Sequence, residues 1–442
     1  MLGPKSRFNP ELTAVMHHSP YRLRDFVSLS VCRGISLNAS VSYTASAAKL
    51  AIHGGTPVRS KPLPYGRQWV GEEDIDAVVA VLRSEWLTTG PKVDEFEAAF
   101  AEATGARHAV SFSSGTAALH GAASAIGFQP GQEAITTPLT FCASANCLLY
   151  CGARPIFADI EADTLLIDPA KIESLINQQT KALVIVDYAG QPAKLQEIFT
   201  IADKHGLAVI EDACHALGAT FQGNPIGSLS TMTVFSFHPV KHITTGEGGM
   251  VTTQDNVIAD KLRHFRNHGI TSDHRQREQL GSWFYEMVEL GYNYRLSDLQ
   301  CALGLSQLRK LDKWVARRRA IACHYDRAFR EIPAVRPLSV RTNVEHAYHL
   351  YVVELGLEEL KGSRAQIFAA LRAEGIGVNV HYIPVHLHPY YRAHQGTTAG
   401  LCPHAEAAYE RILSLPIFPR MSDQDAQDVI EAMRKVIVGF LK

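Results

Sequence analysis

The chain has 442 residues, of which 46% are hydrophobic and 20% charged, the composition of an ordinary globular protein. Its 43 Lys and Arg nearly balance its 44 Asp and Glu, so the net charge of −1 gives no electrostatic case for nucleic acid or an anionic membrane as a partner. No uncharged apolar run in the sequence approaches the length of a membrane span.

Residues 1–48 differ from the rest of the chain. They are basic and rich in serine, and they lack sustained periodicity. This composition is typical of a transit peptide, but Glu11 and Asp25 interrupt it and no secretory apolar core is present. We interpret residues 1–48 as a poorly ordered extension.

The segment from about residue 70 to residue 240 alternates helical periodicity with short apolar runs. EEDIDAVVAVLRS (72–84), TAALHGAASAIG (116–127) and LQEIFTIADKHG (195–206) have helical spacing. The apolar runs are HAVSFSSG (108–115), EAITTPLT (133–140), RPIFADI (154–160), ALVIVDY (182–188), LAVIEDA (207–213) and TMTVFSF (231–237). Short buried strands that alternate with helices predict an α/β fold with a mostly parallel sheet, in which ligands bind beyond the carboxyl ends of the strands.

A second, smaller unit is expected toward the C-terminus. Residues 296–329 have the pattern of one long amphipathic helix, and shorter strand and helix patterns follow in HAYHLYVVEL, RAQIFAALRAEG, GVNVHYIPV and DAQDVIEAMRKVIVGFL. We therefore predict a large domain over residues 49–310 and a small C-terminal α/β domain over 311–442.

The cysteines and histidines show no metal-binding spacing. The eight cysteines contain no CxxC pair, and the 20 histidines contain no HExxH. We therefore expect no metal, and reduced cysteines in a cytoplasmic protein.

Lys241 lies just past the apolar run that ends at Phe237, in a loop of threonines and glycines. Pro239 has no N–H to continue a strand, whereas Gly246 and Gly248 permit a tight loop. A solvated surface lysine is the ordinary interpretation of such a residue. The alternative is an amine held in a pocket, where it could form a Schiff base.

SSGTAAL (113–119) joins a strand to a helix through a glycine. The first N–H groups of a helix have no partner within the helix, so Gly115, Thr116 and Ala117 could donate to a phosphate. Ser236, five residues before Lys241, could donate its hydroxyl to the same phosphate. The turn alone is a weak signal, because many strand–helix junctions contain glycine.

Two further strand ends carry groups that suit a planar, cationic ring. Asp212 ends an apolar strand, where it could pair with a pyridinium nitrogen, although an ordinary capping or surface acid is the default interpretation. Phe141, in PLTFCASAN (138–146), could stack on such a ring, although a core phenylalanine is the default.

Five segments together resemble the PLP-dependent nucleotide-sugar aminotransferases of the DegT/DnrJ/StrS type: SSGTAAL, PLTFCASAN, VIEDACHALGA, FSFHPVKHITTGEGGMV and LGYNYRLSDLQCALG. The resemblance spans about residues 50–442 and implies the type I aminotransferase fold with pyridoxal 5′-phosphate (PLP) as cofactor. It also implies that Lys241 bears the cofactor, Asp212 pairs with the pyridinium and Phe141 lies against the ring. The phosphate would be held by Gly115, Thr116, Ala117 and Ser236.

The resemblance implies further roles around the cofactor. Asn293 would reach the phosphate bound by the neighbouring subunit, so the protein would be a homodimer with composite sites. His215 would face the ring's 3-hydroxyl, as a group that titrates near neutral pH. His381 and Tyr382 would lie on the substrate-side loop of the family.

Within this family, FHPVKHITTGEGG and VHYIPVHLHPYY are most similar to members that aminate C4 of a UDP-linked 4-keto-6-deoxy-2-acetamido sugar in pseudaminic acid formation, with glutamate as donor. Two alternatives remain at this point. One is an aminotransferase for another nucleotide-linked keto sugar, and the other is a regulator that binds PLP without turnover. A PLP-dependent sugar dehydratase would carry histidine in place of Lys241, so the lysine argues directly against it.

Overall fold

The computed structural model describes residues 49–442, so the extension predicted over residues 1–48 lies outside the described residues. A seven-stranded sheet has the order β1-β9-β8-β5-β4-β2-β3. Its strands are β1 (His108–Phe112), β2 (Glu133–Thr136), β3 (Arg154–Phe157), β4 (Thr180–Val186), β5 (Ala208–Asp212), β8 (Met232–Ser236) and β9 (Gly249–Thr253). The pairs β2–β3, β2–β4, β4–β5 and β5–β8 are parallel, and β9 runs antiparallel to both β8 and β1. The predicted mostly parallel α/β sheet is confirmed.

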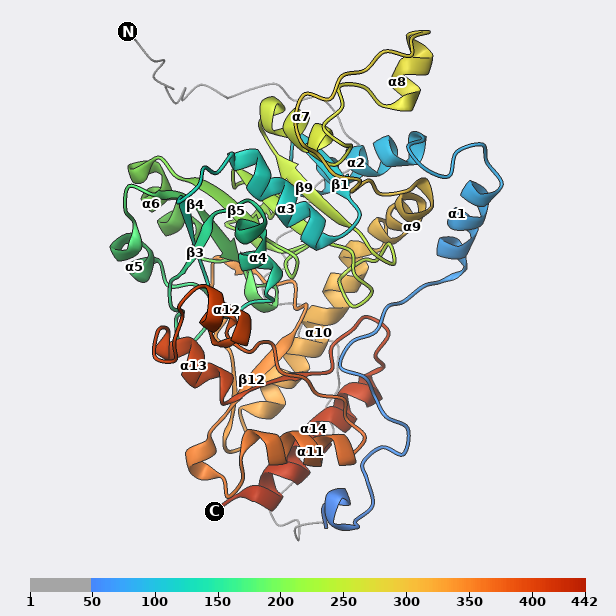
Figure 1. Ribbon diagram of the computed structural model, residues 1–442. Coiled ribbons are helices and arrows are strands. Elements are labelled where there is room, and N and C mark those ends of the chain that lie inside the picture. The colour runs from blue at the N-terminus through green and yellow to red at the C-terminus, as the bar shows by residue number, and fades with distance from the viewer. Residues whose placement is uncertain (1–48) are drawn as a thin grey trace. The chain divides into compact units, whose positions relative to one another are not determined.

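Helices surround this sheet in Figure 1. They are α1 (Glu72–Leu82), α2 (Pro91–Thr104), α3 (Gly115–Ile126), α4 (Ala143–Tyr150), α5 (Pro169–Ile172), α6 (Leu195–His205), α7 (Asn256–Phe265), α8 (His274–Gln279) and α9 (Asp298–Leu308). The short strands β6 (Thr220–Phe221) and β7 (Asn224–Pro225) pair with β11 (Val344–Glu345) in a separate three-stranded sheet.

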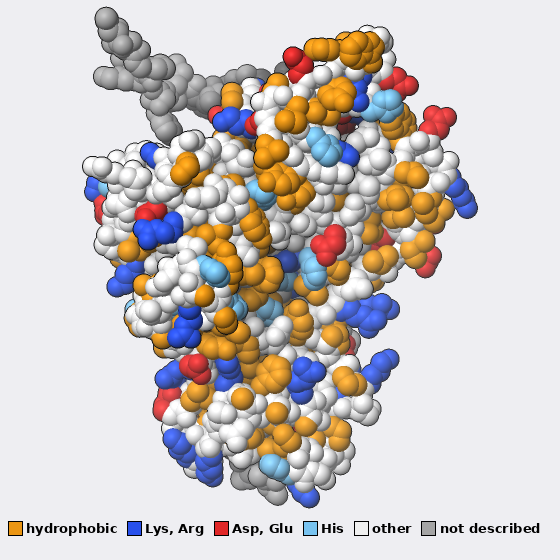
Figure 2. Space-filling model, viewed as in Figure 1, with side chains coloured by type: hydrophobic (Ala, Val, Ile, Leu, Met, Phe, Trp, Pro, Cys, Tyr) orange, Lys and Arg blue, Asp and Glu red, His pale blue; other side chains and the backbone are white. Residues whose placement is uncertain are grey.

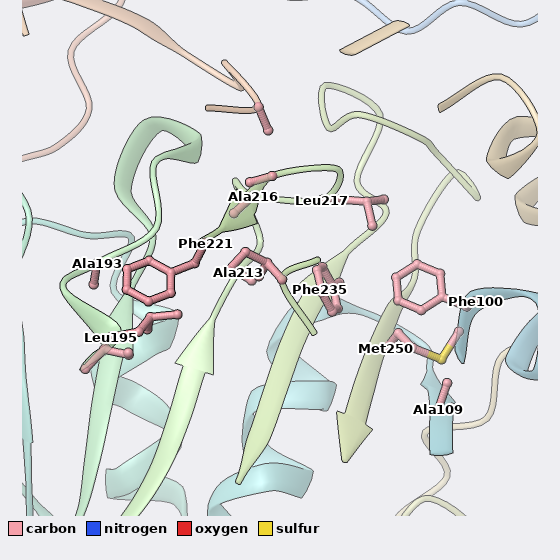
Figure 3. Packing of buried hydrophobic residues seen from close by; sticks show 14 of the residues in the cluster. Phe100, Ala109, Ala193, Leu195, Ala213, Ala216, Leu217, Phe221, Phe235 and Met250 are labelled. Carbon is pink, nitrogen blue, oxygen red and sulfur yellow. The ribbon is translucent and has the colours of Figure 1, made fainter. Parts of the chain in front are cut away.

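The large sheet buries both faces because neighbouring residues of a strand point to opposite sides. Phe235 and Met250 belong to a core on one face, where they pack with Phe100 of α2 (Figure 3). Val234 and Val251, one residue away in each strand, belong to the core under α3, α4 and α7 on the other face. Burial on both sides explains why these strands have continuous apolar runs instead of alternating ones.

The C-terminal part is built on an antiparallel sheet of order β10-β12-β13, with β10 (Val335–Pro337), β12 (Tyr351–Leu355) and β13 (Ile412–Leu415). Its helices are α10 (Leu311–Phe329), α11 (Arg364–Ala373), α12 (Pro389–His394), α13 (Pro403–Tyr409) and α14 (Asp423–Phe440). Leu50 and Leu63, from the start of the described chain, pack into this C-terminal core. Helix α10 contributes Trp314 to the core of the large sheet and Tyr325 to the C-terminal core. The division into domains at residue 310 stays a prediction.

Two details differ from the sequence prediction. Residues 296–329 form two helices, α9 and α10, with a break at Arg309 and Lys310. The amine of Lys310 reaches the buried carboxylate of Asp74 on α1 at 2.8 Å. Strand β9 was not predicted, because its apolar part is only a few residues long and directly follows the glycine-rich loop.

No helix within residues 49–442 has the length and apolar character needed to cross a membrane. The cytoplasmic location expected from the sequence stays a prediction.

Candidate active site

A cavity of about 400 Å³ opens at the carboxyl-end edge of the large sheet, where β1, β5 and β8 end. Most of the predicted site residues line it, namely Gly115, Thr116, Phe141, Asp212, His215, Ser236, Lys241, His381 and Tyr382. These residues come from positions up to 267 apart in the chain (382 − 115), so the fold brings them together. The volume lies within the range of small-molecule sites in proteins.

One end of the cavity is the N-terminus of α3. Ser114 caps this helix by accepting the N–H of Ala117 with its side chain, at 3.0 Å. The Ala117 amide, predicted as a phosphate donor, is therefore used within the cap, which leaves the amides of Gly115 and Thr116. A Cβ on Gly115 would lie 2.8 Å from Cβ of Ser236, so only glycine lets the helix start this close to the end of β8.

Asp212 lies at the end of β5, buried but in contact with the cavity. Its Oδ2 accepts the hydroxyl of Ser144 at 2.6 Å, and its Oδ1 accepts the N–H of Cys214 at 3.2 Å. A carboxylate has about four acceptor positions, so these two bonds orient Asp212 and leave lone pairs for a further donor.

The amine of Lys241 lies in the same cavity. Burial lowers its pKa below the ordinary 10.5, and the nearby Arg318 charge acts in the same direction, whereas Cys214 and Asp212 oppose the shift. Nζ of Lys241 lies 3.5 Å from Nε2 of His349, which also lines the cavity. The interpretation of Lys241 as a solvated surface residue is therefore wrong.

His215 and Tyr382 lie together, with Nε2 of His215 3.2 Å from the Tyr382 hydroxyl. The expectation that His215 titrates near neutral pH is wrong, because burial and then the Lys241 charge lower its pKa well below 6.5. Burial also lowers the pKa of His381 to about 4, and its Nδ1 lies 2.8 Å from the Ser414 hydroxyl. Phe141 lines the cavity and is 57% exposed, and its ring centroid lies 6.1 Å from that of Tyr382.

Asn293 does not line this cavity. It is exposed, and its backbone forms an isolated antiparallel bridge with Asn267. Its role at the phosphate of a second subunit stays a prediction.

Sequence reasoning missed Ser144 and His349. Ser144 lies within PLTFCASAN, three residues after Phe141 and in the first turn of the following helix. Its spacing from Phe141 could have indicated that it lies near the same site. His349 lies just before β12, more than 100 residues after Lys241, and only the tertiary fold brings it to the amine.

The residues of the cavity fit a phosphorylated pyridine aldehyde. The glycine at the start of α3 leaves room beside two helix-terminal amides, Asp212 offers free lone pairs, and Nδ1 of the buried His215 has no hydrogen-bond partner within residues 49–442. An amine, a carboxylate and a phosphate cradle are the groups that PLP requires. In the same part of the chain, no group of three or more His, Cys, Asp or Glu is placed to hold a metal ion.

Comparisons with known proteins agree with this chemistry. The spore coat polysaccharide biosynthesis protein SpsC of Bacillus subtilis is 45% identical over 383 residues, which cover 86% of this chain and 98% of SpsC. Among solved structures, Helicobacter pylori PseC, an aminotransferase involved in the biosynthesis of pseudaminic acid, matches with a TM-score of 0.81 and 34% identity, over 86% of this chain and 100% of PseC. The PLP form of Spr1654 from Streptococcus pneumoniae, a putative sugar aminotransferase, matches with a TM-score of 0.80 and 32% identity, over 86% of this chain and 100% of Spr1654. Residues 68–434 match the model of the DegT/DnrJ/EryC1/StrS aminotransferase family, and the chain belongs to that family.

Proposed function

We propose that this aminotransferase uses PLP to transfer an amino group from glutamate to C4 of a UDP-linked 4-keto-6-deoxy-2-acetamido sugar. The observation that carries the proposal is the meeting of Lys241, Asp212 and the N-terminus of α3 in one cavity. The choice of sugar is supported by the similarity to PseC over nearly the whole described chain.

Each group in the cavity has a defined task in this proposal. PLP, when bound, supplies a ring that takes up the electron pair released when a proton leaves the carbon that bears the amino group. Asp212, oriented by Ser144, keeps the ring nitrogen protonated, and the amides of Gly115 and Thr116 bind the phosphate. Lys241 holds the cofactor and, once free, carries the proton, which its lowered pKa favours because more of the amine is neutral at a given pH.

A different nucleotide-linked keto sugar is the second candidate substrate. The identity to SpsC, 45%, is higher than the 34% to PseC, and SpsC is named for spore coat polysaccharide biosynthesis. The transfer chemistry would be unchanged, and only the sugar would differ.

Two measurements test the proposal. Glutamate added to the PLP-loaded enzyme should convert the cofactor to its amine form and release one equivalent of 2-oxoglutarate, without any sugar. A PLP-binding regulator without turnover would leave glutamate unchanged. The amine form should then be consumed by the UDP-linked 4-keto sugar faster than by dTDP-linked 4-keto sugars, and the reverse preference would assign the second substrate.

We also propose that the working unit is a homodimer with composite sites. Residues 269–292, which we call the α8 arm, form a hairpin-like projection in which Ile270 bridges Met287. Several large apolar side chains of the arm are exposed to solvent: Leu280 is 77% exposed, Trp283 84% and Leu290 75%. In Figure 2 hydrophobic side chains gather over this uppermost part of the molecule and continue toward the middle of the face. An apolar surface of this kind favours a partner, and two-fold pairing of identical chains is the commonest arrangement.

The dimer and the role of Asn293 can be tested by mixing variants. Lys241→Ala and Asn293→Ala homodimers each lack an intact site, whereas a mixed dimer carries both changes in one composite site and leaves the other unchanged. We expect activity to return after co-refolding, provided that Asn293→Ala alone is impaired. Mixed dimers that regain no activity would show that Asn293 serves its own chain or no cofactor.

The arm itself is tested by Trp283→Ser with Leu290→Ser, which should shift the protein toward the monomer in sedimentation. Val257→Ser, which changes a valine of α7 that is also well exposed, is the matched control and should leave the dimer intact. A double variant that stays dimeric would remove the arm from the interface.

A further inference from the structure

The backbone of residues 346–350, which we call the 346–350 segment, is fixed by hydrogen bonds on nearly every peptide group. Side chains reach four consecutive carbonyl oxygens of this segment. Arg319 Nε donates to the carbonyl of His346 at 2.9 Å, and His242 Nε2 lies 3.1 Å from the carbonyl oxygen of Ala347. Arg318 Nη1 donates to the carbonyls of Tyr348 at 3.1 Å and His349 at 3.2 Å. On the other side, the N–H groups of Ala347 and Leu350 donate to the carbonyls of Gly190 and Ala189. Few loops are restrained so completely, because most of their polar groups bond to water.

The guanidinium of Arg318, which holds two of these carbonyls, is buried at a large desolvation cost. Its side chain is 1% exposed and forms no ion pair within residues 49–442, and its third acceptor is the carbonyl of Ile417 at 2.9 Å. A buried charge is normally paired with an opposite charge, so a guanidinium that bonds only to carbonyls points to a strong requirement for the position of this backbone.

The segment is also strained. Tyr348 has φ +50°, in the left-handed region that bulky residues seldom adopt. Gly190 packs directly under it, and a Cβ there would lie 2.9 Å from the Tyr348 nitrogen and 3.0 Å from the His349 nitrogen. Strain of this kind persists only where the surroundings impose it, and it concentrates at functional sites.

The side chain placed by this segment is the imidazole of His349. It is 5% exposed, lines the cavity, and has Nε2 3.5 Å from Nζ of Lys241. The rings of His215 and His242 have their centroids 4.4 Å and 5.8 Å from it. Burial, together with the charge of Lys241, holds the pKa of His349 well below 6.5, so the ring is neutral and can accept an N–H of the lysine.

We propose that His349 is a positioning residue for Lys241. The amine of Lys241 donates to Nε2 of His349 whenever the amine is not bonded to the cofactor, and this bond directs it into the cavity. Arg318 and the strained 346–350 segment hold the imidazole at the required place. The inference rests on the proposed role of Lys241 as the residue that bears PLP.

The test measures how fast PLP becomes covalently attached to Lys241 in the apo-protein, followed by absorbance and checked by borohydride reduction and peptide mass. His349→Phe keeps a ring beside His215 but has no acceptor, and His349→Asn has an amide too short to reach Nζ. Both should slow attachment about 2- to 12-fold, the effect of one hydrogen bond. His349→Gln, whose amide oxygen reaches about as far as Nε2, should stay within about 2-fold of the wild type.

Pyridoxamine 5′-phosphate is the control ligand, because it lacks the aldehyde and binds without bonding to Lys241. Its affinity should be the same in all four proteins, and their thermal unfolding should show that each variant is folded. Equal attachment rates in all variants would overturn the inference and leave the proposed function standing. The inference would also be overturned if His349→Gln attached PLP as slowly as His349→Phe, or if the variants lost affinity for pyridoxamine phosphate in parallel. Either result would mean that the histidine only shapes the cavity. A wild-type protein that attaches no PLP at Lys241 would overturn the proposed function and this inference together.

Discussion

Gly115→Ala should damage the phosphate end of the cavity while adding only one methyl group. The new Cβ would lie 2.8 Å from Cβ and 3.0 Å from Oγ of Ser236, whereas carbon atoms in contact are normally about 3.5–4.0 Å apart. One of the two elements must therefore move by about 1 Å. Strand β8 is held by β5 on one side and β9 on the other, so the N-terminus of α3 is the element that yields.

The displacement should be visible in both stability and binding. Overpacking of this kind typically destabilises a protein by about 1–3 kcal/mol. Moving the amides of Gly115 and Thr116 away from the phosphate should remove one charge-assisted hydrogen bond, about 1.5–3 kcal/mol, or roughly a 10- to 150-fold loss of affinity.

The assay is titration of the apo-protein with pyridoxamine 5′-phosphate, with chemical denaturation of the same samples. Gly66→Ala is the matched control, because its Cβ would meet Val240 only at 3.6 Å, an ordinary contact, and should leave affinity unchanged. The combination Gly115→Ala with Ser236→Gly should recover part of the lost stability, because Ser236→Gly removes the Cβ that the new methyl group would contact too closely. A Gly115→Ala protein with wild-type affinity and stability would refute the account of this end of the cavity.

The remaining predictions concern the chemical groups of the cavity. Lys241→Ala should lower amino transfer by more than about 100- to 10,000-fold, because one residue supplies both attachment and proton transfer, and a variant with more than a few per cent of wild-type turnover would contradict this. Asp212→Asn should still attach PLP but lose most of its single-turnover rate with glutamate, and unchanged kinetics would remove Asp212 from its role. Ser144→Ala should lower the same rate by a smaller factor, about 2- to 12-fold, through the lost hydrogen bond to Asp212, and an unaffected rate would show that the bond does not matter. Raising the pH deprotonates Lys241, so the rate of PLP attachment should rise with a midpoint below 10.5, and a midpoint at or above that value would contradict the lowered pKa.

The sequence predicted the sheet well because its central parallel strands are buried on both faces. Val234 and Phe235 enter different cores, so the run around them is apolar without interruption and stands out from the helical periodicity beside it. Lys241 and Asp212 were identified because they follow such runs, and the carboxyl ends of the strands meet at one edge. The family, the aminotransferase class and the fold are confirmed.

Features that depend on contacts between distant parts of the chain could not be predicted in this way. At the turn between α9 and α10 the Lys310 amine contacts a carboxylate on α1, and the low pKa of His215 arises from burial by the assembled site. His349 has no local signal at all, because its position is set by Arg318 and by the close approach of Gly190. The role of Asn293 depends on a second chain and stays a prediction.

The identity of the residue that bears the cofactor tests the central claim most directly. The wild-type protein is incubated with one equivalent of PLP, reduced with borohydride and digested, and the phosphopyridoxyl group is located by peptide mass. The account predicts one modified peptide, with the group on Lys241, and no modification there in Lys241→Ala. A group spread over several surface lysines, or attached equally well to the Lys241→Ala protein, would contradict it.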